Sequence, residues 1–103
     1  MRDEEYANVF DALADTPAEA ANLSARAELM IALQERVRAW GLPQAETAAR
    51  LGVTRPRLSD LMRSQVHKFS LDALVNLAAA AGLRLRLTLS EAAQEGGAMR
   101  ARG

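Results

Sequence analysis

The chain has 103 residues, of which 50% are hydrophobic and 25% charged, and this composition fits one globular domain with a core of roughly four or five helices. It contains no cysteine, which excludes disulfides, thiolate nucleophiles and cysteine-based zinc sites. Its formal net charge is zero, whereas nucleic-acid-binding domains are usually basic overall.

The charges are distributed unevenly along the chain. Up to Ser24 there is one basic residue, Arg2, against six acidic ones, whereas the segment 50–68 carries five basic residues against Asp60 alone. A zero net charge therefore does not exclude a nucleic-acid partner. No apolar run reaches the roughly 18 residues of a membrane span, and the N-terminus lacks the basic start and apolar core of a signal peptide. We expect no membrane partner.

Residues 1–23 are predicted to form an acidic, partly helical arm. It carries a short apolar pattern, which is a candidate binding surface for a partner protein: Tyr6, Val9, Phe10 and Leu13. The alternative is a frayed terminus that packs one aromatic side chain on the domain.

A long amphipathic helix is predicted between Ser24, as N-cap, and Gly41, as the glycine after the helix. Its apolar residues recur at steps of three and four: Leu29, Met30, Leu33, Val37 and Trp40.

The segment from Pro43 to Met62 has the pattern of a helix-turn-helix. A short helix over 43–51 is followed by Gly52 in a tight turn, and Thr54 then caps a second helix with Pro56 in its first turn. Two helices joined by such a turn place the second one in the major groove of DNA.

The rest of the chain is predicted as a polar loop over 64–69, a helix capped by Ser70 that runs through Ala81, and a strand over 83–89. The strand has one leucine face, formed by Leu83, Leu85, Leu87 and Leu89. Because a lone strand leaves its backbone groups unpaired, we expect it to pair with the same strand of a second copy, or alternatively with the N-terminal arm.

These elements predict an all-α, λ-repressor-like bundle of four to five helices with a C-terminal dimerisation β-strand. The predicted divisions are an arm over 1–23, a DNA-binding domain over 24–90 and a flexible tail over 91–103.

The exposed side chains of the motif suit recognition of double-stranded DNA. Arg57 can donate two hydrogen bonds to guanine, Arg55 can do the same or contact a phosphate, and Ser59 can donate or accept. Asp60 can accept from cytosine N4, orient Arg57 or Arg63, or limit non-specific affinity. The alternative is an ordinary solvated helix face. The candidate DNA-binding set is Gln44, Thr54, Arg55, Arg57, Ser59, Asp60, Arg63 and Lys68.

No catalytic arrangement is visible in the sequence. There is no paired nucleophile and base, glycine-rich phosphate loop or pair of carboxylates at suggestive spacing. His67 is the single histidine, and without a second ligand nearby a metal site is not expected. We therefore predict a protein that is not an enzyme and has no cofactor.

The residues from about Leu29 to Leu89 resemble the xenobiotic-response-element (Cro/cI-like) family of helix-turn-helix regulators. Three segments, 44–48 (QAETA), 51–59 (LGVTRPRLS) and 69–74 (FSLDAL), resemble more narrowly its HigA-like antitoxin branch. The chain departs from that pattern at Pro43, where a threonine cap is usual, and at Asp60, where arginine or lysine is frequent. The second departure puts the target sequence in doubt.

The resemblance implies a homodimeric autorepressor of a toxin-antitoxin pair, which also binds and neutralises a small basic ribonuclease toxin. It implies a cytoplasmic, nucleoid-associated protein. The alternative is a stand-alone helix-turn-helix regulator with no toxin partner.

Overall fold

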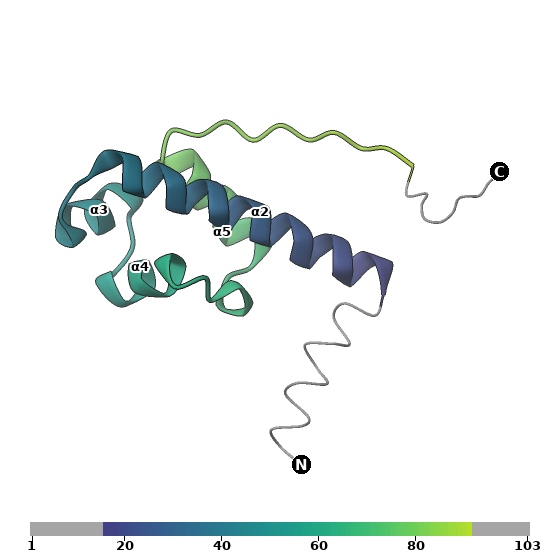
Figure 1. The fold of residues 1–103 in the computed structure, drawn as a ribbon, viewed down its shortest axis with the longest axis horizontal. Coiled ribbons are helices and arrows are strands. Elements are labelled where there is room, and N and C mark those ends of the chain that lie inside the picture. The colour runs from purple at the N-terminus through teal and green to yellow at the C-terminus, as the bar shows by residue number, and fades with distance from the viewer. Residues whose placement is uncertain (1–15, 92–103) are drawn as a thin grey trace, which may run out of the picture.

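The computed structural model describes residues 16–91. In chain order these form α2 (Pro17–Trp40), α3 (Gln44–Leu51), α4 (Arg55–Met62), the 3-10 turn η1 (Val66–Lys68) and α5 (Leu71–Ala80), as Figure 1 shows. No β-strand occurs between residues 16 and 91. The prediction of a helical helix-turn-helix fold is therefore confirmed for this part of the chain.

Helix α2 is the longest element and extends across the whole bundle (Figure 1). It begins at Pro17, after Thr16, whose hydroxyl oxygen accepts a hydrogen bond from the Glu19 N–H at 3.1 Å. The prediction that Ser24 caps this helix was wrong. Thr16 supplies the cap, Pro17 suits the first helical position, and the alanine-rich residues that follow are good helix formers. The predicted boundary between arm and domain at residue 23 thus falls inside α2.

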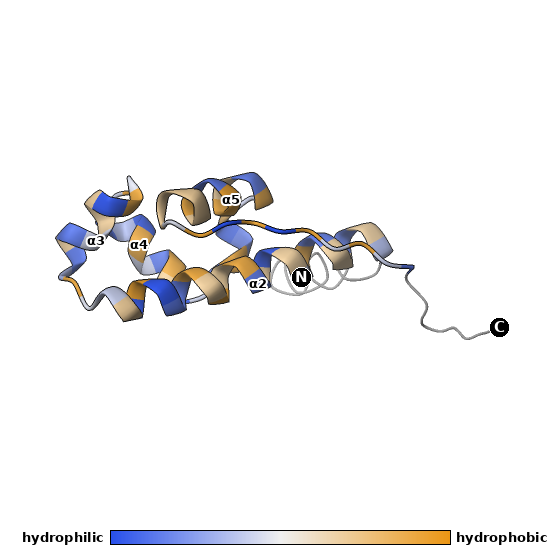
Figure 2. Ribbon diagram, turned by 90° about the horizontal axis from the view of Figure 1, so that it is seen from above, coloured by the Kyte–Doolittle hydropathy of each residue, from blue (hydrophilic) through white to orange (hydrophobic). Residues whose placement is uncertain are grey.

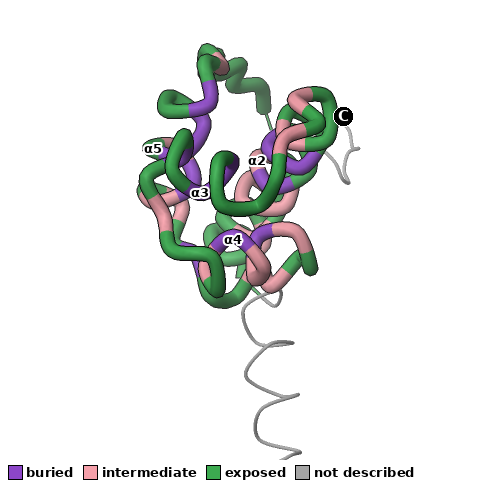
Figure 3. Tube along the Cα trace, turned by 90° about the vertical axis from the view of Figure 1, so that its left-hand side faces the viewer, coloured by how far each residue is buried: buried purple, intermediate pink, exposed green. Residues whose placement is uncertain are grey.

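The hydrophobic core lies between α2 and the other helices (Figure 3). Helix α2 contributes Met30 and Leu33, and Phe69, which follows η1, is only 1% exposed. Figure 2 shows that hydrophobic and hydrophilic residues alternate along the helices. The other buried apolar residues come from the motif and from α5 with its C-cap: Ala48, Leu51, Leu58, Leu61, Leu74, Leu77, Ala78 and Ala81.

Polar side chains of α2 also bind the other elements through their backbone carbonyls. Arg26 donates from Nη1 to the carbonyl oxygens of Val66 and Phe69, at 3.2 and 3.3 Å. Arg36 donates from Nε to the carbonyl oxygen of Ala81 at 3.0 Å. These bonds tie the ends of η1 and α5 to α2, and the Val66 carbonyl also accepts from the Phe69 N–H at 3.2 Å. Helix α2 is therefore a common frame for the rest of the bundle.

The predicted helix boundaries after α2 agree with the structure to within one or two residues. Pro43 is the N-cap of α3, and Thr54 and Ser70 cap α4 and α5 through their hydroxyl oxygens. The segment predicted as a loop over 64–69 contains η1, with Phe69 as its buried anchor.

The chain leaves α5 at Gly82, whose φ of 80° is a left-handed conformation that glycine adopts without steric cost. Residues 83–90 then run beside α2 as an extended segment (Figure 1). The predicted β-strand over 83–89 is not seen, because no other described segment forms a ladder with it. A strand exists only when a second backbone accepts and donates its hydrogen bonds.

Candidate nucleic-acid interface

Helices α3 and α4 are joined by three residues, Gly52, Val53 and Thr54. Gly52 has a φ of 73°, and the N–H groups of Gly52 and Val53 donate to the carbonyls of Ala49 and Ala48, at 3.1 and 2.9 Å. Only a residue without a Cβ takes this conformation readily, so the glycine determines the turn. Ala48 is 4% exposed, and its small side chain lets the two helices approach closely.

The N-terminal residues of α4 are exposed to solvent. Thr54 accepts a hydrogen bond from the Arg57 N–H at 3.2 Å, and Pro56 occupies the first turn, where no amide hydrogen is needed. Thr54, Arg55 and Pro56 are all exposed. The positive end of the helix dipole therefore lies at the surface, where an anion such as a phosphate is stabilised.

The helical period divides α4 into two faces. Leu58 and Leu61 are buried against the core, which turns the ridge formed by Pro56, Ser59 and Arg63 away from it. Arg63, which follows the helix, is exposed, and Ser59 is half-buried. This ridge is the part of α4 that a groove of DNA could receive.

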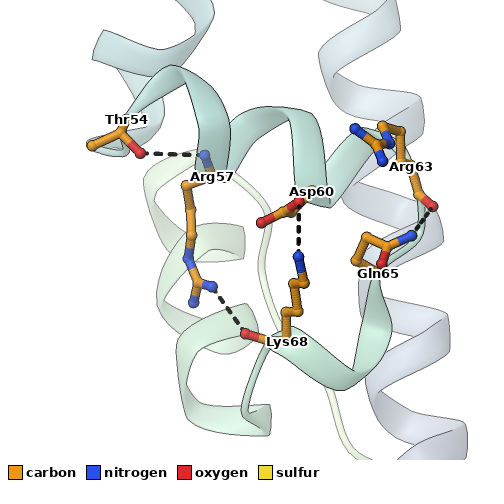
Figure 4. Close-up of polar contacts among 6 residues, drawn as sticks. All are labelled: Thr54, Arg57, Asp60, Arg63, Gln65 and Lys68. Atoms are coloured by element: carbon orange, nitrogen blue, oxygen red, sulfur yellow. Dashed lines mark hydrogen bonds and ion pairs between the residues drawn. The ribbon is translucent and has the colours of Figure 1, made fainter. Parts of the chain in front are cut away.

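Arg57 does not lie on that ridge. Its guanidinium carbon lies 3.9 Å from the centre of the Phe69 ring, and its Nη1 donates to the Lys68 carbonyl oxygen at 2.9 Å (Figure 4). The arginine thus makes a cation–π contact and a hydrogen bond within its own chain. In the free protein Arg57 is therefore directed toward the last residue of η1 and Phe69, and its role as a base reader stays a prediction.

Asp60 also faces the segment that contains Lys68. Its carboxylate lies 3.6 Å from the Lys68 ammonium group, and the two side chains are 24% and 49% exposed (Figure 4). An ion pair this exposed contributes little to stability, about 0–1 kcal/mol. Its effect is electrostatic, because the carboxylate partly neutralises the lysine.

Arg55 is paired with the start of the preceding helix. Its Nη2 donates to the Gln44 side-chain oxygen at 3.2 Å, across an exposed surface. The N-termini of α3 and α4 therefore lie close together, and this pair is free to exchange for phosphate or base contacts. In the last turn of α3, the guanidinium carbon of Arg50 lies 4.7 Å from the centre of the Trp40 ring.

The C-terminal end of α4 is hydrogen-bonded by Gln34, a residue that the sequence analysis did not single out. Gln34 of α2 is 6% exposed and donates from Nε2 to the Leu61 carbonyl at 2.8 Å and to the Ser64 hydroxyl at 2.9 Å. Ser64 has a φ of 60°, which costs a non-glycine residue about 1–2 kcal/mol. The sequence contained one indication of this role, because Gln34 lies next to Leu33 in the apolar pattern of α2, where a polar side chain needs a hydrogen-bond partner.

The structure brings most of the predicted set to one side of the bundle. Gln44 and Arg55 meet at the two helix N-termini, while Asp60, Arg57 and Lys68 form a second group. His67 is exposed in η1. The leucines of 83–89 lie on the extended segment beside α2, apart from this surface (Figure 1). Tyr6, Val9, Phe10 and Leu13 lie outside the described residues.

Between residues 16 and 91 the chain holds no group of three or more histidine, aspartate and glutamate side chains that could bind a metal ion. None of its helices there combines the length and the hydropathy that crossing a bilayer requires.

The helix-turn-helix arrangement agrees with a comparison with known protein families. Residues 12–90 match the model of a family described as a helix-turn-helix domain. The chain belongs to this helix-turn-helix family. The family match includes all the described helices and the extended segment.

A solved structure shares the fold. It is a protein assigned to the XRE family of transcriptional regulators, with a TM-score of 0.66 and 26% sequence identity, over 82% of this chain and 94% of that one. Comparison with curated proteins gave no match.

Proposed function

We propose that the protein is a sequence-specific DNA-binding transcriptional repressor that acts as a homodimer. The observation that carries the proposal is the pair α3 and α4, with the capped N-terminus of α4 and its basic residues at the surface. The XRE assignment of the structurally similar protein supports it. Such a protein inserts α4 into the major groove while α3 crosses the backbone.

The positions of these residues suggest which of them contact bases and which contact phosphates. Arg55 and Ser59 are the proposed base readers, because Arg55 is exposed at the tip of α4 and Ser59 lies on its outward ridge. Gln44 and the free N–H groups at the start of α3 contact a phosphate. Arg63 and Lys68 follow the backbone. Thr54 acts as the cap that orients the tip.

Arg57 is proposed to position α4 rather than to read a base. Its cation–π contact with Phe69 and its bond to the Lys68 carbonyl would both have to break before it could reach into a groove. Those contacts hold α4 against the segment after η1. Asp60 lowers the positive charge beside that segment and so reduces binding to DNA of any sequence.

The experiment is a fluorescence-anisotropy titration of the full-length protein on DNA from its own promoter and on a scrambled duplex, at several salt concentrations. Affinity for both should fall steeply with salt because counterions are released from the phosphates, and promoter DNA should bind more tightly. Arg38→Ala, at an exposed arginine of α2 outside the motif, is the control. Binding that does not respond to salt, or that does not distinguish the duplexes, would refute the proposal.

A second activity is proposed for the N-terminal arm: neutralising a small basic ribonuclease toxin. Six acidic residues against one basic residue up to Ser24 suit a basic partner, and Tyr6, Val9, Phe10 and Leu13 supply an apolar contact. The resemblance to HigA-like antitoxins points the same way. The test is whether a short reading frame for a basic protein adjoins this gene, and whether its purified product binds the full-length chain.

The matched variants for that test are Tyr6→Ala with Phe10→Ala, which should lose toxin binding and keep DNA binding. Arg55→Ala should show the opposite pattern. A protein that binds DNA but no neighbouring gene product is a stand-alone regulator, and the antitoxin proposal would then fail.

A further inference from the structure

The segment after Gly82 has an incomplete set of backbone hydrogen bonds. The Leu83 N–H donates to the Ala78 carbonyl at 2.9 Å, and the Leu83 side chain lies half-buried against the core. From Arg84 to Glu91 the backbone makes no hydrogen bond to any other residue that the structure describes. Extended backbone in this state is a template for pairing with another chain.

The leucines of the same segment become more exposed with distance from α5. The exposed fraction is 43% for Leu85, 78% for Leu87 and 92% for Leu89. Their inner members line an open groove of about 530 Å³ against apolar residues such as Leu29 on α2 and Val75 on α5. The leucine face therefore points toward the bundle at its start and is uncovered at its end.

We propose that a second copy of this chain pairs antiparallel with residues 84–90, and that the twofold axis passes through Leu87. This inference rests on the homodimer of the proposed function and specifies its interface. It assigns the register from the arrangement of leucines and arginines.

The alternation of the segment restricts the possible registers. Side chains directly opposite each other in an antiparallel pair lie on the same face. A one-residue slip would place each leucine opposite an arginine or a polar residue and would move one strand's apolar face to the solvent. Only registers centred on a residue keep the leucines of both copies together.

The arginines decide among those registers. An axis at Arg86 places that arginine opposite itself, and an axis at Leu85 places Arg84 opposite the partner's Arg86 twice. Like charges directly opposite each other are destabilising. An axis at Leu87 instead places Arg86 opposite the partner's Thr88 and Arg84 opposite the partner's Ser90.

The leucines favour the same axis. With Leu87 on the axis, Leu87 meets its own copy and Leu85 meets the partner's Leu89, so the three exposed leucines are all matched. Leu83 needs no cross-strand partner because it lies against its own core. An axis one residue later, at Thr88, would place Leu85 opposite the carboxylate of the partner's Glu91.

The test is cysteine crosslinking of the full-length chain, which has no cysteine of its own. In Leu87→Cys the two copies of the residue would lie about 4.5–5.5 Å apart at their Cα atoms, within the range of a disulfide. Mild oxidation should convert most of this variant into a covalent dimer on a non-reducing gel. Thr88→Cys, one residue away on the opposite face, is the matched control and should stay uncrosslinked.

A second measurement uses two variants that should not crosslink alone. The Cα atoms of Leu85 and its own copy would be offset by four residues, roughly 13 Å along the strands. Leu85→Cys and Leu89→Cys should each remain uncrosslinked under oxidation and should form a mixed disulfide when combined. Because these residues are exposed, the variants should fold, which circular dichroism can verify.

Several outcomes would overturn the inference. Crosslinking at Arg86→Cys in place of Leu87→Cys would refute the register. A wild-type chain that stays monomeric at all tested concentrations would refute the second copy as occupant and favour the N-terminal arm or a different protein.

DNA binding is measured separately under reducing conditions. A salt-sensitive, promoter-selective monomer would retain DNA recognition and lose this interface. A protein that crosslinks at Leu87→Cys under oxidation, but binds no DNA when reduced, would retain the interface and refute the DNA-binding proposal.

Discussion

The α3–α4 motif and the segment 83–90 differ in how far their leucines are buried and their polar groups have partners within the chain. In the motif, Thr54 caps α4, the leucines are buried, and the half-buried Arg57 and Asp60 have partners within the chain. In the segment, Leu85, Leu87 and Leu89 are exposed, and the backbone of residues 84–91 lacks partners among the described residues. The polar and apolar groups of the motif are satisfied within the chain, whereas we propose that a second copy supplies the missing partners of the segment.

The largest expected contrast between the two regions is in core packing. Leu61→Ala, at a residue with 0% exposure, should lower the free energy of unfolding by about 2–5 kcal/mol, because it leaves a cavity under α4. Leu89→Ala, at 92% exposure, should change it by less than about 0.5 kcal/mol in the monomer. Urea unfolding at low protein concentration measures both. Equal losses would show that the segment packs within its own chain.

The next effect concerns the end of α4. Gln34→Ala should lower the free energy of unfolding by about 1–3 kcal/mol, because the buried Leu61 carbonyl loses its donor and Ser64 loses a contact that holds its left-handed backbone. Gln65→Ala, which removes one exposed bond to the Arg63 carbonyl, is the control. Thermal unfolding followed by circular dichroism gives the comparison. A null result for Gln34→Ala would mean that water replaces the lost donor.

A third prediction separates positioning from reading within the motif. Arg57→Ala should lower the free energy of unfolding by about 1–2 kcal/mol, because a cation–π contact and a hydrogen bond are lost. Arg55→Ala should leave stability nearly unchanged and weaken binding to promoter DNA by about 1–3 kcal/mol. Unfolding and anisotropy titrations on both variants are needed. The assignment is reversed if Arg57→Ala is fully stable and loses sequence selectivity.

The smallest effect is expected at the exposed ion pair. Asp60→Asn should change stability by no more than about 1 kcal/mol, since Lys68 is half-exposed. It should strengthen binding to the scrambled duplex at low salt, because a negative charge near the phosphates is removed and Lys68 is released. Weaker binding to promoter DNA alone would instead identify Asp60 as a base reader.

Local signals in the sequence predict most of the fold. Thr54, Ser70 and Gly52 act within a few residues of their own position, as caps and as a left-handed turn, and the structure contains all three. The start of α2 was misplaced because both Thr16 and Ser24 are acceptable caps, and only Thr16 is followed by a proline. The site was less predictable, since the contacts of Arg57 and Gln34 join residues 11 or more positions apart. Spacing along one helix carries no information about such partners.

The left-handed backbone at Gly82 bears on the half-site spacing that related proteins would recognise in DNA. It determines the direction in which the chain leaves α5, and the bond from Arg36 to the Ala81 carbonyl ties that point to α2. Helix α2 also holds the end of α4 through Gln34. In a dimer joined by the C-terminal segments, one torsion would therefore set the separation of the two α4 helices, which must match half-sites about 34 Å apart. A change at Gly82 would alter the length of the operator that fits while leaving every base-reading side chain in place.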